Sequence, residues 1–120
     1  MPCVRLVAAD AVCDQRLASL WCTVIAQQLT AQLDQLQAEL PEITALPETA
    51  YAQKIVLRGR AISLMNTCAQ AAIIAASGAA NMLGHPAQRV YKESLVFSVS
   101  GQTTAGAIAS LSYLTSAPPA

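Results

Sequence analysis

The feature that most constrains the fold is the absence of charge from two long stretches of the chain. No Asp, Glu, Lys or Arg lies between Arg60 and Arg89, and none follows Glu93. Each stretch is long enough for a helix that is buried on most sides or that crosses a bilayer. Polar residues such as Asn66 and Ser98 interrupt both stretches. We therefore expect buried helices and no membrane contact, with a membrane helical hairpin as the alternative.

The spacing of apolar residues predicts two long helices in the first two thirds of the chain. Apolar side chains recur at three- and four-residue steps over residues 10–40, which indicates an amphipathic helix that Pro41 ends. Leu46-Pro47-Glu48 is typical of a helix entry, because proline suits the first turn and glutamate the helix dipole. The second helix is predicted over residues 47–83.

A third helix is predicted over residues 86–114. Gly84 suits the end of the preceding helix and Pro86 the first turn of the next one. Serines, β-branched residues and Gly101 weaken the middle of the third helix, so we expect a break or kink there. Residues 116–120 are predicted to form a frayed tail.

Length and composition limit the possible functions. The 120 residues suit one domain, 54% of them are hydrophobic and only 4% are aromatic. The formal net charge of zero gives no electrostatic basis for binding nucleic acid. We expect a single all-α domain over residues 1–120, built as an antiparallel bundle of three long helices.

The cysteines favour buried free thiols over a metal site. Cys3, Cys13, Cys22 and Cys68 form no C-x-x-C step, and His85 is the only histidine, which argues against zinc. The first residues lack the apolar core and cleavage site of an export leader. We therefore expect a reducing, cytoplasmic setting.

Four landmarks follow one another at fixed spacings in the second half of the chain. They are Ser77-Gly78-Ala79-Ala80, Pro86, Lys92-Glu93 and Gly101-Gln102-Thr103. Their order, spacing and chemical type resemble the C-terminal helical domain of the acyl-CoA dehydrogenase family, over roughly residues 51–114. The resemblance covers three of the four bundle helices of that domain. It implies an FAD-dependent CH–CH oxidoreductase as the parent protein, with a flavin-binding β domain or a homo-oligomer as the packing partner.

The resemblance also implies cofactor-binding residues. Gly78 would let backbone N–H groups approach the FAD phosphates, and Gln102 and Thr103 would contact the cofactor from the second glycine turn. Two structural roles remain open beside these. Gly78 can serve close helix packing, and the Thr103 hydroxyl can cap a helix.

The chain departs from the family pattern where the family carries its polar and acidic groups. Ile74 and Ala105 stand in place of two glutamines that contact the cofactor, and Gly101 stands in place of the catalytic glutamate. Glycine has no side chain to accept a proton. We therefore expect no catalytic residue and no activity from this chain alone.

The remaining ionisable residues predict structural roles. Glu93 is expected to form a salt bridge with Lys92, with Arg89 or with another helix, because it lies beside several cations. His85 precedes a proline and is expected in a turn or cap.

Two functions are consistent with these residues. The chain is either the C-terminal helical domain or a fragment of an acyl-CoA dehydrogenase-like flavoprotein, in which it serves packing and oligomerisation, or a non-enzymatic helical oligomerisation module. In both, an apolar bundle face left uncovered drives association.

Overall fold

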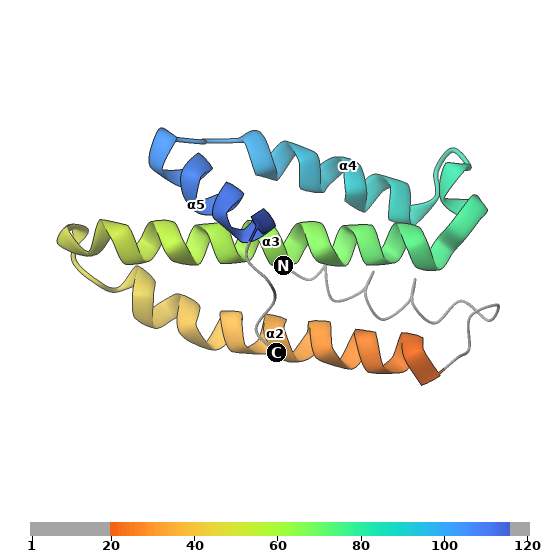
Figure 1. Ribbon diagram of the computed structural model, residues 1–120, viewed down its shortest axis with the longest axis horizontal. Helices are drawn as coiled ribbons and strands as arrows, with labels where there is room; N and C mark the ends of the chain where they lie inside the picture. Colours follow the sequence, from red (N-terminus) through yellow and green to blue (C-terminus); the bar gives the residue numbers. More distant parts are fainter. Residues whose placement is uncertain (1–19, 116–120) are drawn as a thin grey trace.

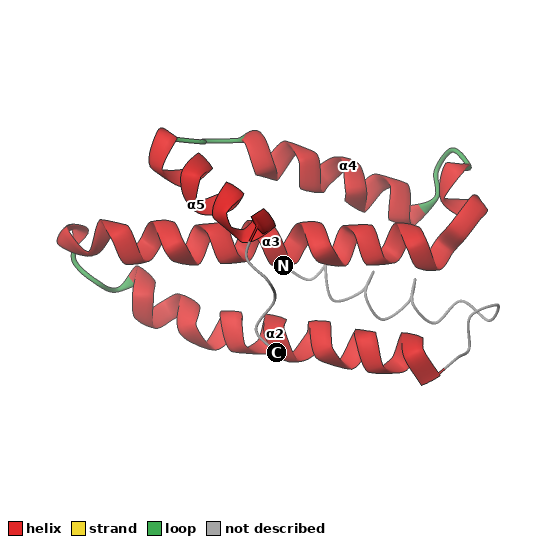
Figure 2. Cartoon of the chain, viewed as in Figure 1, coloured by secondary structure: helices red, strands yellow, loops and turns green. Residues whose placement is uncertain are grey.

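The computed structural model describes residues 20–115, and within these residues it is all-helical, without strands (Figure 2). The start of the predicted first helix and the predicted frayed tail lie outside the described residues. Four α-helices and two short 3-10 turns follow one another: α2 (Leu20–Thr44), η2 (Glu48–Ala50), α3 (Tyr51–Ala76), η3 (Ser77–Asn81), α4 (Pro86–Val99) and α5 (Thr104–Thr115).

Helix α3 is the centre of the molecule, because α2, α4 and α5 all pack against it (Figure 1). The chain reverses direction at each short connection, so α2 and α4 flank α3 and α5 folds back over it.

Leucines of α2 form the contact with α3. Leu29, Leu33 and Leu36 lie on one face of α2 at four- and three-residue steps, and all three are buried. Leu29 and Leu33 pack against Met65 and Cys68 of α3. Burying a leucine side chain stabilises a protein by about 1.5–3 kcal/mol, so this stripe holds α2 in place.

Small residues form the contact between α3 and α4. Ala72 and Ala76 of α3, Ala80 of η3 and Ala87 of α4 make one buried cluster, which we call the alanine seam. Because alanine carries only a methyl group, the helices approach closely. This explains how a stretch without charge is buried with few large side chains.

Helix α5 approaches α3 at a glycine. A Cβ atom added to Gly59 would lie 3.2 Å from the backbone C and O of Ala109 and 3.3 Å from a ring carbon of Tyr113. A Cβ added to Gly78 would meet nothing within 4 Å. Close helix packing, the structural alternative for Gly78, is therefore performed by Gly59 instead.

The predicted connection into α4 is confirmed. Gly84 has a φ of +84°, the left-handed conformation that glycine adopts without strain. His85 is the N-cap of α4, and its Nδ1 accepts a hydrogen bond from the backbone N–H of Ala87 at 3.2 Å. Pro86 lies in the first turn as expected.

The third predicted helix, over residues 86–114, is divided into α4 and α5. The chain leaves helical geometry at Ser100, and Gly101 has a φ of +61°. The expected break is thus confirmed, and the described part of the chain holds four α-helices where three were predicted.

The predicted end of the first helix at residue 40 is wrong, because α2 continues through Pro41 to Thr44. Proline lacks an N–H and removes one helical hydrogen bond. Two hydrogen bonds hold the last turn: the Thr44 hydroxyl donates to the carbonyl of Leu40 at 2.8 Å, and Ala45 N donates to the carbonyl of Pro41 at 3.1 Å.

The second predicted helix, over residues 47–83, is longer than the α-helix observed. Its first turn is 3-10 helical, and α3 ends at Ala76. Ser77 has a φ of +52° and a ψ of −137°, a conformation that L side chains rarely adopt, and the chain continues as a 3-10 turn. The helix therefore ends directly before the Ser77-Gly78 pair.

One helical segment among the described residues, Glu48–Asn81, is long and apolar enough to cross a membrane by length and composition alone. In the structure, 33% of its apolar window is buried within the protein. Buried core helices of soluble proteins have the same properties, so the absence of membrane contact stays a prediction.

Candidate functional site

A groove of about 710 Å³ lies between α3 and α4. We call it the α3–α4 groove. Most of its lining is apolar, and one serine and three charged side chains contribute the rest. The lining residues are Arg58, Ala61, Ile62, Met65, Arg89, Val90, Glu93, Ser94, Val96 and Phe97. Its size lies within the range of ligand sites.

Arg58 connects the groove to the turn between α4 and α5. Its Nη2 donates a hydrogen bond to the backbone carbonyl of Ser100. Its Nε atom is buried and has no hydrogen-bond partner among the described residues. A buried donor without a partner is unfavourable, so Arg58 retains capacity for a further acceptor.

Glu93 forms the other charged wall of the groove. Arg89 Nε donates to Glu93 Oε1 at 2.8 Å across one helical turn, which confirms the expected salt bridge. Arg89 is largely exposed, and exposed pairs at this spacing contribute only about 0.3–0.5 kcal/mol.

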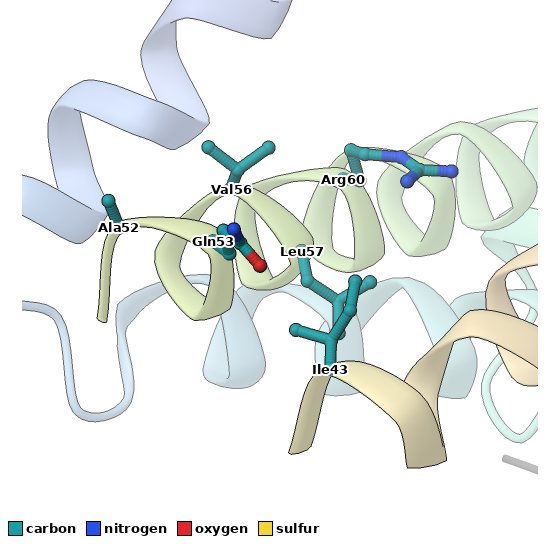
Figure 3. A pocket seen from close by; sticks show the side chains of 6 residues that line it. All are labelled: Ile43, Ala52, Gln53, Val56, Leu57 and Arg60. Carbon is teal, nitrogen blue, oxygen red and sulfur yellow. The ribbon is translucent and has the colours of Figure 1, made fainter. Parts of the chain in front are cut away.

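A second, smaller pocket of about 380 Å³ lies where α2 meets the start of α3. Figure 3 shows it from close by, with the side chain of Leu57 directed toward Ile43. Ala52, Gln53, Val56 and Arg60 complete the lining.

Arg60 at the edge of this pocket is bound to α2. It forms a salt bridge with Glu39, in which Nη2 donates to Oε1 at 3.4 Å and Nη1 donates to Oε2. The hydrogen bond from Arg60 holds the pKa of the Glu39 carboxyl below its ordinary value. The cation that lines this pocket is thus satisfied, which leaves an apolar recess without a reactive group.

The described residues contain no cluster of three or more His, Cys, Asp and Glu that could hold a metal ion. Cys68 is a free thiol buried between α2 and α3, as expected, and burial raises its pKa to about 11. A thiol with so high a pKa is protonated at neutral pH and is a poor nucleophile.

The structure does not bring the three predicted cofactor residues together. Gly78 lies in η3 at one end of α3, and Gln102 and Thr103 lie in the α4–α5 turn toward the other end (Figure 1). Arg58 bonds to this turn and lies 18 residues before Ala76, a distance of roughly 27 Å along a helix.

The polar groups of the α4–α5 turn are engaged within the chain. Gln102 Nε2 donates to the carbonyl of Ser98 at 2.9 Å. Thr103 Oγ1 accepts from the backbone N–H of Gly106 at 3.1 Å, which matches the helix-cap role named as its alternative. An FAD contact at either residue would have to displace or share these bonds, whereas exposed Gly78 offers open backbone. The turn residues therefore fit a cofactor poorly and Gly78 fits it better.

Three contacts seen in the structure were not predicted from the sequence. Gly59 lies between Arg58 and Arg60, and charged neighbours are typical of a solvent-facing turn of helix. Arg58 and Ser100 are 42 residues apart, so no local pattern predicts their bond. Asn66 did carry a signal, because it is an amide in the apolar part of the predicted second helix. Its Nδ2 donates to Ser98 Oγ at 3.1 Å across the α3–α4 contact.

Comparisons with models of protein families, with curated proteins and with solved structures found no match to this chain. The relationship to the acyl-CoA dehydrogenases stays a prediction from the four landmarks.

Proposed function

We propose that this chain is a helical packing module that associates with a second copy of itself, built on an antiparallel bundle in which α2, α4 and α5 pack against α3. The observation that carries the proposal is the exposure of large apolar side chains on α4 and α5. Eight of them are between 41% and 77% exposed: Tyr91, Leu95, Val96, Phe97, Val99, Ile108, Leu111 and Leu114.

The composition of this surface favours a protein partner. No charged residue follows Glu93, so α5 and the end of α4 present apolar groups without charge. A second copy meets no like-charge repulsion there, and a protein interface buries such groups in its centre. Peripheral membrane helices instead combine apolar residues with Lys and Arg on the polar face, which α5 lacks.

The available free energy is sufficient for association. Complete burial of one large apolar side chain contributes about 1.5–3 kcal/mol, and these side chains are on average a little more than half exposed. Burying most of them gives on the order of 10 kcal/mol per copy, against an association cost of about 4–15 kcal/mol.

Oligomeric state measured by light scattering over a concentration series tests the proposal. The unmodified chain should associate reversibly, and the combined variant Phe97→Gln with Leu111→Gln should associate at least tenfold more weakly. Removing one half-buried aromatic from each of two copies costs more than the 1.4 kcal/mol that a tenfold change requires. Leu40→Gln is the matched control, because Leu40 is also about half exposed but lies on α2. A chain that stays monomeric throughout, or a double variant that associates like the unmodified chain, would contradict the proposal.

The second candidate is the C-terminal helical domain or a fragment of an acyl-CoA dehydrogenase-like flavoprotein. It is supported by the four landmarks and by the open surroundings of Gly78, whose backbone a phosphate group can approach without meeting a side chain. FAD titration followed by flavin fluorescence, with Gly78→Val beside the unmodified chain, tests it. Quenching that Gly78→Val weakens would support the cofactor role, and quenching equal in both would remove Gly78 from it.

A further inference from the structure

We infer that the α3–α4 groove receives α4 of a second copy in a two-fold symmetric contact, in which Arg58 of each copy pairs with Glu93 of the other. The inference deepens the proposed self-association by naming its contact, and it rests on that proposal.

The groove carries the two charges that such a contact requires. Arg58 lines it from α3 and Glu93 from α4. In a two-fold contact, a residue that faces a second residue across the interface is met by the same pair on the other side of the axis. Arg89, the second cation of the groove, is already paired with Glu93 within α4. Arg58 and Glu93 are therefore self-complementary across a two-fold axis, and the contact holds two equivalent ion pairs.

Among residues 20–115, no carboxylate pairs with Arg58. Its Nε is buried without a hydrogen bond, and no salt bridge joins it to a carboxylate of the described residues. Its one hydrogen bond goes to a neutral backbone carbonyl. Arg58 lines the groove, so its guanidinium can donate to an incoming carboxylate there, and the ion pair satisfies its charge.

Glu93 can provide that carboxylate without losing its own fold contact. Its side chain is 40% exposed, and its bond to Arg89 uses one of two carboxylate oxygens. An ionised carboxylate accepts several hydrogen bonds. Glu93 can therefore hold Arg89 within its own helix and Arg58 of the second copy at once.

The apolar lining of the groove provides both the side chains that enter the groove of the second copy and the surface that receives them. Phe97 and Val96 line the groove and are each 59% exposed, so they are both part of the receiving surface and available to enter the groove of the second copy. Ile62 and Met65 form buried parts of the lining against which they can pack. Helix-in-groove contacts combine these elements, with apolar anchors in the centre and charges at the edge.

Charge reversal in two separate chains tests the pairing. Arg58→Glu alone places two carboxylates opposite each other across the interface, and Glu93→Arg alone places two guanidinium groups opposite each other. Each variant should associate at least tenfold more weakly than the unmodified chain. In an equimolar mixture, positions 58 and 93 are both anionic in one chain and both cationic in the other, so we expect 1:1 heterodimers by light scattering and by native mass spectrometry. A salt bridge within one chain cannot produce this recovery.

Two control variants separate the pairing from general charge effects. Glu42→Arg makes the same change on the exposed surface of α2, and Lys92→Glu reverses a charge on an exposed part of α4 that does not line the groove. Both should associate like the unmodified chain. Circular dichroism checks that every variant keeps its helical signal. If Arg58→Glu loses it, Glu93→Arg must still weaken association at least tenfold relative to Glu42→Arg.

The outcomes distinguish this inference from the proposed function. If the unmodified chain associates but the two charge variants do so equally well, or if their mixture stays monomeric while both are folded, the pairing is wrong and self-association stands. Recovery in the mixture supports the pairing. A monomeric unmodified chain overturns both, and saturable binding of a small apolar carboxylate to that monomer would assign the groove to a different occupant.

Discussion

Replacing Gly59 with alanine is expected to destabilise the protein by about 1 kcal/mol, although alanine is the better helix former. The helix-propensity term alone would stabilise α3 by about 1 kcal/mol. Against this, the new Cβ would lie 3.2 Å from two backbone atoms of Ala109. Unstrained carbon contacts begin at about 3.5 Å. A backbone cannot rotate away as a side chain can, so α5 must move outward, and overpacking of this kind costs about 1–3 kcal/mol.

Gly78→Ala is the matched control for this prediction. Gly78 has no positive φ, and an added Cβ meets open space, so the same chemical change should stabilise the protein by about 0.4–1 kcal/mol. Urea unfolding followed by circular dichroism gives both values, and the two variants should differ by about 2 kcal/mol. Equal stabilisation by both substitutions would refute the close approach of α5 to α3 at Gly59.

Three further perturbations have defined outcomes. Ser77→Gly should raise the free energy of unfolding by about 1 kcal/mol, because glycine relieves the strain of a φ of +52°; an unchanged urea midpoint would speak against that strain. Cys68 should react with iodoacetamide at least tenfold more slowly in the folded protein than in urea at about pH 8, since its pKa is raised to about 11 and it is buried; peptide mapping by mass spectrometry measures this. The lowered pKa of Glu39 predicts a stabilisation that is complete above the ordinary value of 4.5 and is lost as the pH falls through the lowered folded value. Arg60→Gln should remove that part of the pH dependence, and identical urea midpoints between about pH 6 and about pH 3 in both proteins would argue against the pairing.

The sequence predicted the helical class and the turns that glycine and proline determine. Gly84, Pro86 and Gly101 act through their own backbone preferences, which operate without knowledge of the rest of the fold. The end of α3 was missed because Ser77 adopts a glycine-like conformation beside a real glycine. The end of α2 was missed because the loss of one helical hydrogen bond at Pro41 does not end the helix there.

The α3–α4 groove could not be predicted from the sequence, because it depends on contacts between residues far apart in the chain. Arg58 lies within the predicted second helix, but its bond to Ser100 requires the turn at Gly101 to place that carbonyl nearby. The salt bridge of Glu93 was predictable, because its partner is four residues away on the same helix. Long-range pairing is set by how α3 and α4 meet, and that meeting depends on alanines, which carry little directional information.

The alanine seam also determines which parts of this protein can move. Alanine has no side-chain rotamers, so Ala72, Ala76 and Ala87 offer no alternative packing through which α3 and α4 could slide past each other. Leucine and methionine between α2 and α3 can exchange rotamers and tolerate small displacements. We therefore expect the α3–α4 pair to behave as one stiff body, with α5 held to it by the close approach at Gly59, and α2 to be the element that shifts against it.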